Sequence, residues 1–307
     1  MDNRSYEETK KIAIESKSSN NQESQTESQH PTTARRAGRE KRSHGCGCLI
    51  LVLMAVLLYF IAPVKTQFLI LGIDRAPQGT MAGRSDTIMI VSVNPLLPEV
   101  KLLSIPRDLW VPIPGFGENR INAAHFFAEA QQPGTGSQKT LETIKYNFGV
   151  ELRHYVRINL AGLPALIDAM GGITLNLPQV MAGYPEGTND LNGDQALAFV
   201  RSRSDGDDFF RMRQGQLFIA AFMRQLFTPS TWARFPQIMK TLPQALDTNL
   251  PFWQLPRLLV ALLRATYTGI DTLTIDRSLV TPAVTSEGAQ ILLPNWDLIL
   301  PYIGENF

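Results

Sequence analysis

Charged side chains stand at the ends of three apolar segments that are predicted to form buried strands. The segments are residues 67–73, 88–93 and 100–105. The charged residues beside them are Asp74, Arg84, Asp86, Arg107 and Asp108. Polar groups at the rim of an apolar sheet are where α/β folds build ligand sites. Because strand side chains alternate with a period of two, we expect Arg84 and Asp86 to share one face. A guanidinium group offers phosphate or carboxylate a planar, permanently charged partner, and ordinary surface ion pairing is the alternative.

A second charged group lies in LNGDQALAFVRSRSDGDDFFRMRQGQ, residues 191–216. The pattern predicts a helix over 194–199 and a long amphipathic helix over 207–227. On a helix Arg201 and Arg203 would diverge by about 200°, so they converge only on extended backbone or at a helix end. Asp208 and Arg211 share one face of the first turn of the long helix at i, i+3. A surface helix with a capping Asp and solvated Arg residues is the structural alternative.

Helix and strand patterns alternate through the rest of the chain. Helices are predicted over 122–130, 137–148, 160–170, 231–240 and 252–266, and strands over 154–159, 173–177 and 273–275. Ser137 is expected to cap its helix. This alternation favours the α/β class. A stripe of leucines marks 252–266, at Leu255, Leu258, Leu259, Leu262 and Leu263. Such a stripe favours core packing over a lipid groove, and we expect residues 228–307 to complete the same domain.

Composition excludes several classes of protein. The net charge of +1 argues against a nucleic-acid partner. The two cysteines, Cys46 and Cys48, rule out a disulfide-stapled fold and a Cys-rich zinc site. Four histidines leave little room for a multi-His metal centre. The chain has no GxxxxGK[ST] motif to cradle a nucleotide and no GxSxG nucleophile elbow.

Three regions follow one another along the chain. Residues 1–44 are polar, end in a basic cluster and predict a disordered cytoplasmic tail. Residues 45–64 carry no charge, and a 20-residue helix is about 30 Å long, the thickness of a bilayer core. Basic residues before this segment predict a single span with its N-terminus in the cytoplasm. Residues 65–307 would then lie on the extracytoplasmic face. A cleaved signal peptide and a buried core helix are the alternatives for 45–64.

The sequence resembles the LytR–CpsA–Psr family of membrane-anchored cell-envelope proteins. The resemblance rests on seven segments in the family's order: GID (72–74), RSDT (84–87), SIPRD (104–108), NRINAAH (119–125), VRINLAGLPALIDAMGGI (156–173), LNGDQALAFVRSR (191–203) and DFFR (208–211). It implies an α-β-α sandwich around a central mixed sheet, with a hydrophobic groove for lipid. It also implies transfer of a glycopolymer from a polyprenyl-diphosphate carrier to a cell-wall acceptor, usually peptidoglycan.

The resemblance also implies roles for particular residues. Asp74 and Asp86 match metal-side carboxylates for a magnesium-like ion. The expected clamp on the diphosphate consists of Arg84, Arg107, Arg201, Arg203 and Arg211, and Arg120 and Asp208 match further motif positions. Among these, Arg107, Arg201, Arg203 and Asp208 are the predicted catalytic residues. The family's basic-Gln-Gln run reads Arg213-Gln214-Gly215-Gln216 here, and Gln216 is the predicted remaining substrate contact.

The chemistry of the residues agrees with this interpretation. Attack on phosphorus adds charge to the transferring group, which positioned Arg side chains and a hard cation stabilise. Magnesium prefers oxygen ligands and keeps several waters, so two Asp suffice. If the Arg residues converge, they do so on an anion; otherwise each pairs with its own local Asp. The alternatives are a non-catalytic glycan-binding or scaffold protein, a lipid-diphosphate hydrolase, and a transcriptional regulator, for which the tail shows no helix-turn-helix pattern.

Overall fold

The computed structural model describes residues 44–61, 65–74, 81–94, 99–202 and 208–307. The chain divides into two compact units, Met1–Leu51 and Val52–Phe307, and α2 (His44–Ile61) begins in the first and ends in the second. Within the described ranges, no helix is both long and apolar enough to cross a membrane. The predicted tail lies outside the described residues except for its last residue, and so do residues 62–64 of the predicted span. Both segments stay predictions.

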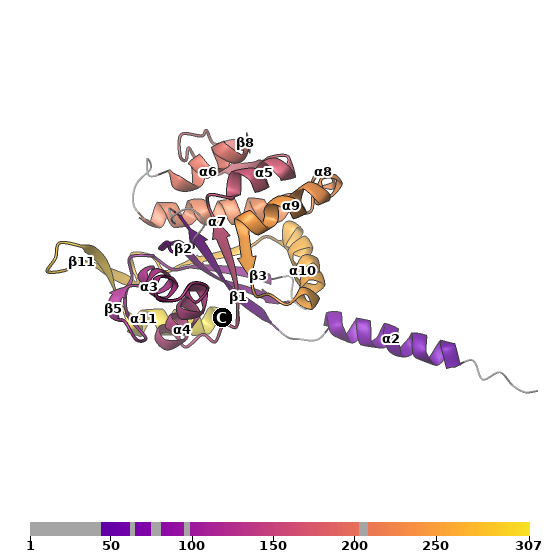
Figure 1. Cartoon of the computed structure of the whole chain (residues 1–307), viewed down its shortest axis with the longest axis horizontal. Helices are drawn as coiled ribbons and strands as arrows, with labels where there is room; N and C mark the ends of the chain where they lie inside the picture. Colours follow the sequence, from indigo (N-terminus) through magenta and orange to yellow (C-terminus); the bar gives the residue numbers. More distant parts are fainter. Residues whose placement is uncertain (1–43, 62–64, 75–80, 95–98, 203–207) are drawn as a thin grey trace, which may run out of the picture. The chain divides into compact units, whose positions relative to one another are not determined.

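A six-stranded mixed sheet forms the centre of the second unit (Figure 1), with strand order β10-β3-β2-β1-β6-β9. The strands are β1 (Thr66–Ile73), β2 (Ser85–Asn94), β3 (Glu99–Ser104), β6 (His154–Asn159), β9 (Leu246–Thr248) and β10 (Asp271–Thr274). β1 pairs antiparallel with β2 and parallel with β6. Its last six residues are all buried, because FLILGI has no polar side chain and both faces of a central strand are covered.

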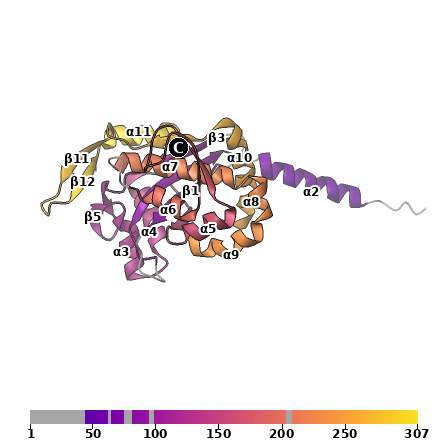
Figure 2. The same ribbon diagram turned by 90° about the horizontal axis from the view of Figure 1, so that it is seen from above.

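Helices cover both faces of this sheet (Figures 1 and 2). The helices of one layer are α5 (Leu163–Met170), α6 (Gly193–Arg201), α7 (Asp208–Gln225), α9 (Phe235–Ala245) and α10 (Leu255–Thr268), and they pack in one core with Phe68, Ile70, Met89, Val91 and Leu102. On the other face α4 (Gly136–Phe148) and α11 (Trp296–Asn306) pack on Leu69, Leu71, Ile88, Ile90 and Leu103. Alternate residues of each strand thus enter opposite cores. The predicted α/β class and α-β-α sandwich are confirmed.

The remaining elements are short. They are β4 (Trp110–Ile113), β5 (Gly117–Arg120), α3 (Ala123–Gln131), β7 (Ile173–Leu177), β8 (Gly187–Leu191), α8 (Pro229–Ala233), the 3₁₀ turn η1 (Phe252–Gln254), β11 (Val280–Val284) and β12 (Gln290–Pro294). β4–β5, β7–β8 and β11–β12 are antiparallel hairpins outside the main sheet. β10 joins the edge of the main sheet beside β3. Residues 228–307 lie in the same compact unit as the main sheet.

The prediction that Ser137 caps α4 is wrong. The helix begins one residue earlier, and Ser137 is buried inside it. The carboxylate of Glu129, on α3, takes the capping role instead, because it accepts hydrogen bonds of 2.9 Å from the backbone N–H groups of Gly134 and Gly136. A carboxylate suits the positive end of a helix dipole. These bonds, with the nearby Arg157, hold the pKa of Glu129 below its ordinary value although burial acts in the opposite direction.

The NGD motif at the start of α6 has a packing reason. Gly193 donates its N–H to a carboxylate oxygen of Asp168 on α5 at 2.7 Å. A Cβ on Gly193 would lie 2.2 Å from the carbonyl oxygen of Pro164, in the first turn of α5. The two helices therefore approach so closely that only glycine fits.

We expect Gly193→Ala to lower the free energy of unfolding by about 1–3 kcal/mol, because overpacking forces the backbone to shift. Urea unfolding of the full chain in detergent, followed by near-UV circular dichroism, measures this loss. Gly304→Ala on α11 is the matched control, since a Cβ there meets nothing within 4 Å. Equal midpoints for the two variants would contradict the packing argument.

Candidate active site

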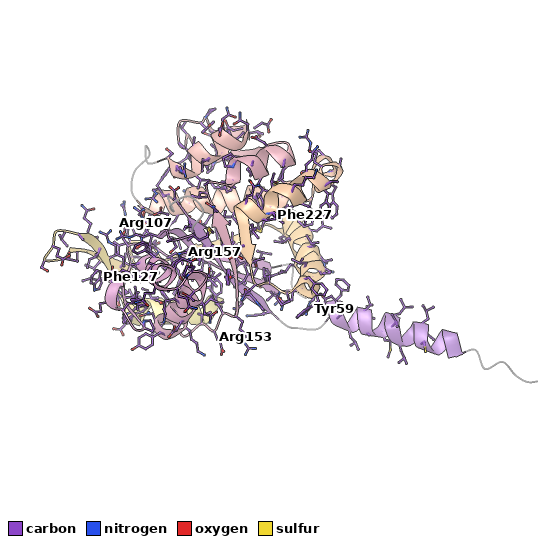
Figure 3. The ribbon with its side chains drawn as sticks, viewed as in Figure 1. Tyr59, Arg107, Phe127, Arg153, Arg157 and Phe227 are labelled. Carbon is purple, nitrogen blue, oxygen red and sulfur yellow. The ribbon has the colours of Figure 1, made fainter. Side chains whose placement is uncertain are left out.

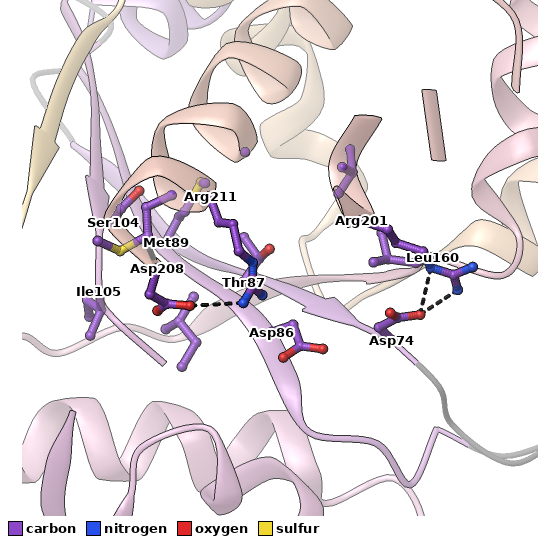
Figure 4. A pocket seen from close by; sticks show the side chains of 14 residues that line it. Asp74, Asp86, Thr87, Met89, Ser104, Ile105, Leu160, Arg201, Asp208 and Arg211 are labelled. Atoms are coloured by element: carbon purple, nitrogen blue, oxygen red, sulfur yellow. Dashed lines mark hydrogen bonds and ion pairs between the residues drawn. The ribbon is translucent and has the colours of Figure 1, made fainter. Parts of the chain in front are cut away.

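The predicted carboxylates lie at one edge of the sheet, where β1 and β3 end and β2 begins. Asp74 follows the last residue of β1. Asp86 is the second residue of β2, at a bulge: Gly72 pairs with Thr87 and Ile73 with Ser85, so Asp86 has no partner across the ladder. A bulge redirects a side chain that regular pleating would fix. Both Asp74 and Asp86 line the same hollow (Figure 4). The period-of-two argument did not foresee this bulge.

Arg107 connects the edge of the sheet to α7. Its Nη1 donates to Asp86 at 2.6 Å, and its Nε lies 3.0 Å from Asp208 and 3.5 Å from Asp108. Burial disfavours the charged form of Arg107. The carboxylates of Asp208, Asp86 and Asp108 outweigh that cost and hold its pKa above the ordinary value. Arg107 is therefore a fixed cation that binds three carboxylates from three segments.

Asp208 stands at the first residue of α7, where the helix dipole favours a negative charge. Its Oδ1 accepts a bond of 3.0 Å from Arg211, which confirms the predicted i, i+3 pair (Figure 4). Burial raises the pKa of Asp208 above its ordinary value, although Arg107 and Arg211 act in the opposite direction. The surroundings of Asp208 thus favour uptake of a proton.

Arg201 closes the opposite side of the hollow. It lies at the end of α6 and donates its Nε to Asp74 at 3.0 Å, 127 positions away in the chain (Figure 4). Its side chain is 38% exposed, whereas that of Asp74 is 8% exposed. The Arg201 side chain is therefore partly exposed to solvent. Arg203 and Asp205 lie outside the described residues.

Arg84 and Arg120 line an adjoining polar hollow together with Asp74, Asp86 and Arg107. Arg120, at the end of β5, lies 3.4 Å from Asp108 and donates its Nη2 to the carbonyl of Gln290 at 2.7 Å. Arg84 is exposed. The contact with Gln290 brings the β11–β12 hairpin to the site, and no signal in residues 280–294 indicated it.

Gln216 lies apart from this cluster. Its side chain is buried, and its Nε2 lies within hydrogen-bond distance of Ser104 Oγ, the Leu273 carbonyl and Thr274 Oγ1. These contacts join α7 to β3 and β10. A substrate contact for Gln216 stays a prediction. The neighbouring Gly215 lines the main hollow, and a Cβ there would lie 3.0 Å from the terminal methyl of Met89.

The expected convergence of arginines is found among the described residues. Carboxylates converge with them, so an anion is not the sole partner that could hold them together. Five guanidinium groups gather with four carboxylates at the two hollows; they are Arg84, Arg107, Arg120, Arg201 and Arg211 with Asp74, Asp86, Asp108 and Asp208. The local pair of Arg107 with Asp108 is present at 3.5 Å, but Arg107 also pairs with Asp86 and Asp208. Arg201 pairs with the distant Asp74. Repulsion between the arginines alone therefore does not require a bound anion, because the carboxylates neutralise them.

A buried histidine supports the loop that carries Arg84. His125, from the NRINAAH segment, donates its Nδ1–H to the carbonyl of Gly83 at 2.9 Å. Its Nε2 lies 3.4 Å from Nη1 of Arg157, which lies on β6 (Figure 3). Arg157 also binds Glu129 at 3.2 Å and Asp247 at 2.7 Å. The sequence singled out the NRINAAH segment as a motif but gave His125 no role.

Comparison with known proteins adds the family. The LytR_cpsA_psr family model matches residues 8–294. The chain belongs to this family. Its segments at the site, from GID to DFFR, are thus those of a LytR–CpsA–Psr protein. Solved structures with the same fold include "Crystal structure of B. subtilis TagV", with a TM-score of 0.62 and 25% identity over 79% of this chain and 97% of that one. Another is "TagT bound to LIIa-WTA", with a TM-score of 0.61 and 21% identity over 78% and 88%.

Curated relatives in the LytR–CpsA–Psr family carry two kinds of name. A protein of Oceanobacillus iheyensis named polyisoprenyl-teichoic acid–peptidoglycan teichoic acid transferase TagU is 35% identical over 200 residues, which cover 63% of this chain and 61% of the relative. Its namesake in Enterococcus faecalis is 31% identical over 60% and 61%. The regulatory protein MsrR of Staphylococcus aureus is 27% identical over 61% and 57%. The chain thus spans about three fifths of the length of these relatives.

The carboxylates of this LytR–CpsA–Psr site fit a small divalent cation in part. Asp74 and Asp86 offer oxygen ligands at one hollow, which suits magnesium. Among the described residues, no group of three or more His, Cys, Asp or Glu is placed to hold a metal ion. A cation at Asp74 and Asp86 would therefore take its other ligands from water and from the substrate, as magnesium does at phosphate sites.

We expect His125 to make the stability of the protein depend on pH. Burial lowers its pKa below the ordinary value of 6.5, with Arg157 acting in the same direction. The unfolded chain therefore binds a proton that the folded chain rejects, and stability falls as the pH drops below about 6.5. Urea unfolding between pH 5 and 7.5 measures this slope. His125→Asn should flatten it. Equal slopes in His125→Asn and the wild-type protein would exclude His125 as the cause.

Proposed function

We propose that this chain is a phosphotransferase that moves a glycopolymer from a polyprenyl-diphosphate carrier to a cell-wall acceptor such as peptidoglycan. Membership of the LytR–CpsA–Psr family supports this class of reaction, and so do the teichoic acid transferase names of two relatives. The observation that carries the proposal is the cluster of five guanidinium and four carboxylate groups at one edge of the sheet. No nucleic acid takes part.

The ion pairs of the cluster leave it able to bind phosphate. A guanidinium group has five N–H donors, and one carboxylate accepts only two of them in a fork. Arg201 uses Nε and Nη2 on Asp74 and is still partly exposed. Arg84 is exposed beside the same carboxylates. In our proposal, the diphosphate of the donor binds between these two arginines and Arg107.

In this proposal, the cation and the arginines each neutralise part of the negative charge of the diphosphate. A magnesium ion held by Asp74 and Asp86 would neutralise phosphate oxygens and stabilise the charge that builds up during transfer. Arg107 and Arg201 would then bind the phosphate oxygens bidentately. Arg120 and Arg211 remain paired with Asp108 and Asp208, and they keep those carboxylates in position at the rim of the site.

Transfer of the glycopolymer is a substitution at phosphorus. A hydroxyl oxygen of the acceptor forms a new bond to the phosphorus that carries the glycan. The bond from that phosphorus to the bridging oxygen breaks, and polyprenyl phosphate leaves. The hydroxyl proton needs an acceptor, and Asp208 is the candidate, because its raised pKa improves a carboxylate as a base. Water in place of the acceptor would give hydrolysis, so product analysis separates the two reactions.

The donor chemistry also requires a membrane. A polyprenyl carrier stays in the bilayer, and the uncharged segment 45–64 after a basic cluster suits a single-pass anchor. We therefore propose that the chain sits in the cytoplasmic membrane, with its N-terminus in the cytoplasm and the domain after residue 65 on the outer face.

Arg107→Lys should lose most transfer activity, at least tenfold in rate, with little change in melting temperature. Lysine keeps the charge but lacks the fork that binds carboxylate and phosphate together. Release of polyprenyl phosphate from a lipid-diphosphate glycan donor measures the rate, with the full chain in proteoliposomes. Arg203→Lys should behave alike. Arg153→Lys is the matched control, since its side chain is 80% exposed and lies 3.9 Å from Glu151. Near wild-type release by both Arg107→Lys and Arg203→Lys would remove the clamp from the proposal.

Asp74→Asn and Asp86→Asn should each raise the magnesium concentration for half-maximal release at least tenfold. An amide oxygen can still accept a bond from Arg201 or Arg107, but it binds a hard cation less well than a carboxylate. Glu142→Gln on α4 is the control, because its carboxylate binds Lys139 away from the site. Undiminished activity of the wild-type protein in chelator would show that the two Asp side chains act only as ion-pair partners.

A further inference from the structure

An apolar surface remains exposed on η1 and α10. Phe252 is 76% and Trp253 57% exposed. Leu255, Leu259 and Leu263 continue this surface along α10 at intervals of four residues, and all three are exposed. Leu258, Ala261 and Ala265 on the same helix are buried in the core. The predicted leucine stripe thus divides into a core face and an exposed face. A helix that is apolar on both faces needs a second apolar environment.

The segment that carries this surface is basic. Residues 248–270 contain two arginines and no acidic residue. The arginines are Arg257 and Arg264, and both stand on α10 itself. Aromatic side chains flanked by Arg and Lys are typical of the boundary between membrane and water, where anionic headgroups attract the basic groups.

Strand pairing and a side-chain contact place η1 beside the start of β1. Phe68 near the start of β1 pairs with His154 at the start of β6, and the side chain of His154 lies 3.4 Å from that of Gln254 in η1. Four residues separate the end of α2, at Ile61, from Thr66. The five residue-to-residue steps from Ile61 to Thr66 span at most roughly 18 Å. Within the second unit, the Tyr59 hydroxyl donates to the Trp253 carbonyl, and Arg257 lies 5.5 Å from the Tyr59 ring. Figure 3 labels Tyr59 at the end of α2.

We propose that η1 and the exposed face of α10 rest on the outer surface of the lipid bilayer, with Phe252 and Trp253 at the headgroup level and Arg257 and Arg264 among anionic lipids. The proposal rests on the proposed membrane anchor, because the short connection to Thr66 then keeps this surface close to the bilayer. β1 rises about 3.3 Å per residue, so its eight residues separate Asp74 from that edge by roughly 25 Å. Docking would therefore fix the height at which the clamp meets the donor's diphosphate.

Quenching of tryptophan fluorescence by spin-labelled lipids tests the proposal in the full chain. The protein is reconstituted in vesicles of phosphatidylglycerol and phosphatidylcholine that carry a nitroxide high on the acyl chain. Trp253→Phe should remove at least half of the quenching. Trp296→Phe is the matched control and should keep it, since Trp296 packs on Phe148 in the opposite helix layer. Arg257→Gln with Arg264→Gln should weaken the quenching, and so should omission of phosphatidylglycerol.

The outcomes distinguish failure of the proposed docking surface from failure of the membrane anchor on which it rests. Release of wild-type protein from the vesicles by alkaline carbonate would show that the anchor fails. Retention with equal quenching in Trp253→Phe and Trp296→Phe would overturn the docking surface alone. Dimers held through α10, detected by cross-linking at a Leu259→Cys position, would also overturn it, because a second copy would then cover the surface.

Discussion

Arg107 binds carboxylates that belong to the start of β2, to the loop after β3 and to the first turn of α7. β2 and β3 already pair with each other through the backbone, and Ile105 after β3 donates its N–H to the carbonyl of Ile88. The ion pair of Arg107 with Asp208 adds the first turn of α7 to them. The ion pairs are partly buried, so their geometry is worth more than that of a surface pair, and removal of one partner would leave a charge without compensation. Arg107, which also belongs to the proposed reaction, therefore joins the first turn of α7 and one wall of the main hollow to the sheet, while apolar packing holds the rest of the helix.

A second ionic network lies around Arg157 on β6. Arg157 on β6 joins Glu129 of α3 to Asp247 of β9, and its side chain is 9% exposed. Glu129 caps α4 and His125 holds the carbonyl of Gly83, so the network links the central sheet to the loop that carries Arg84. Two kinds of arginine thus occur in this domain. Arg157 is buried, whereas the side chains of Arg201 and Arg84 are exposed.

The proposed function and the proposed membrane surface use opposite ends of β1. Asp74 follows its last residue, and η1 lies beside its beginning. A rigid central strand, buried on both faces, would therefore set the distance between the bilayer and the diphosphate clamp. Such a spacer suits a donor whose lipid stays in the membrane while its glycan is delivered to the wall. β1 lacks polar residues after Gln67 because both of its faces are buried.

The sequence determined the elements whose signals are local. β6 and β7 coincide with the predicted strands because their apolar patterns and flanking glycines act over a few residues. The Asp208–Arg211 pair followed from helical spacing alone. The arginines and carboxylates of the site lie in the sequence segments shared with the family. Only the tertiary structure decided their partners, because an ion pair between Arg201 and Asp74 depends on packing across 127 positions. The same is true of the bulge at Asp86, which arises from the register between two strands, and of the carboxylate cap that Glu129 supplies in place of Ser137. The sequence marks α10 as a leucine stripe, and packing against the sheet then decides which leucines enter the core and which stay exposed.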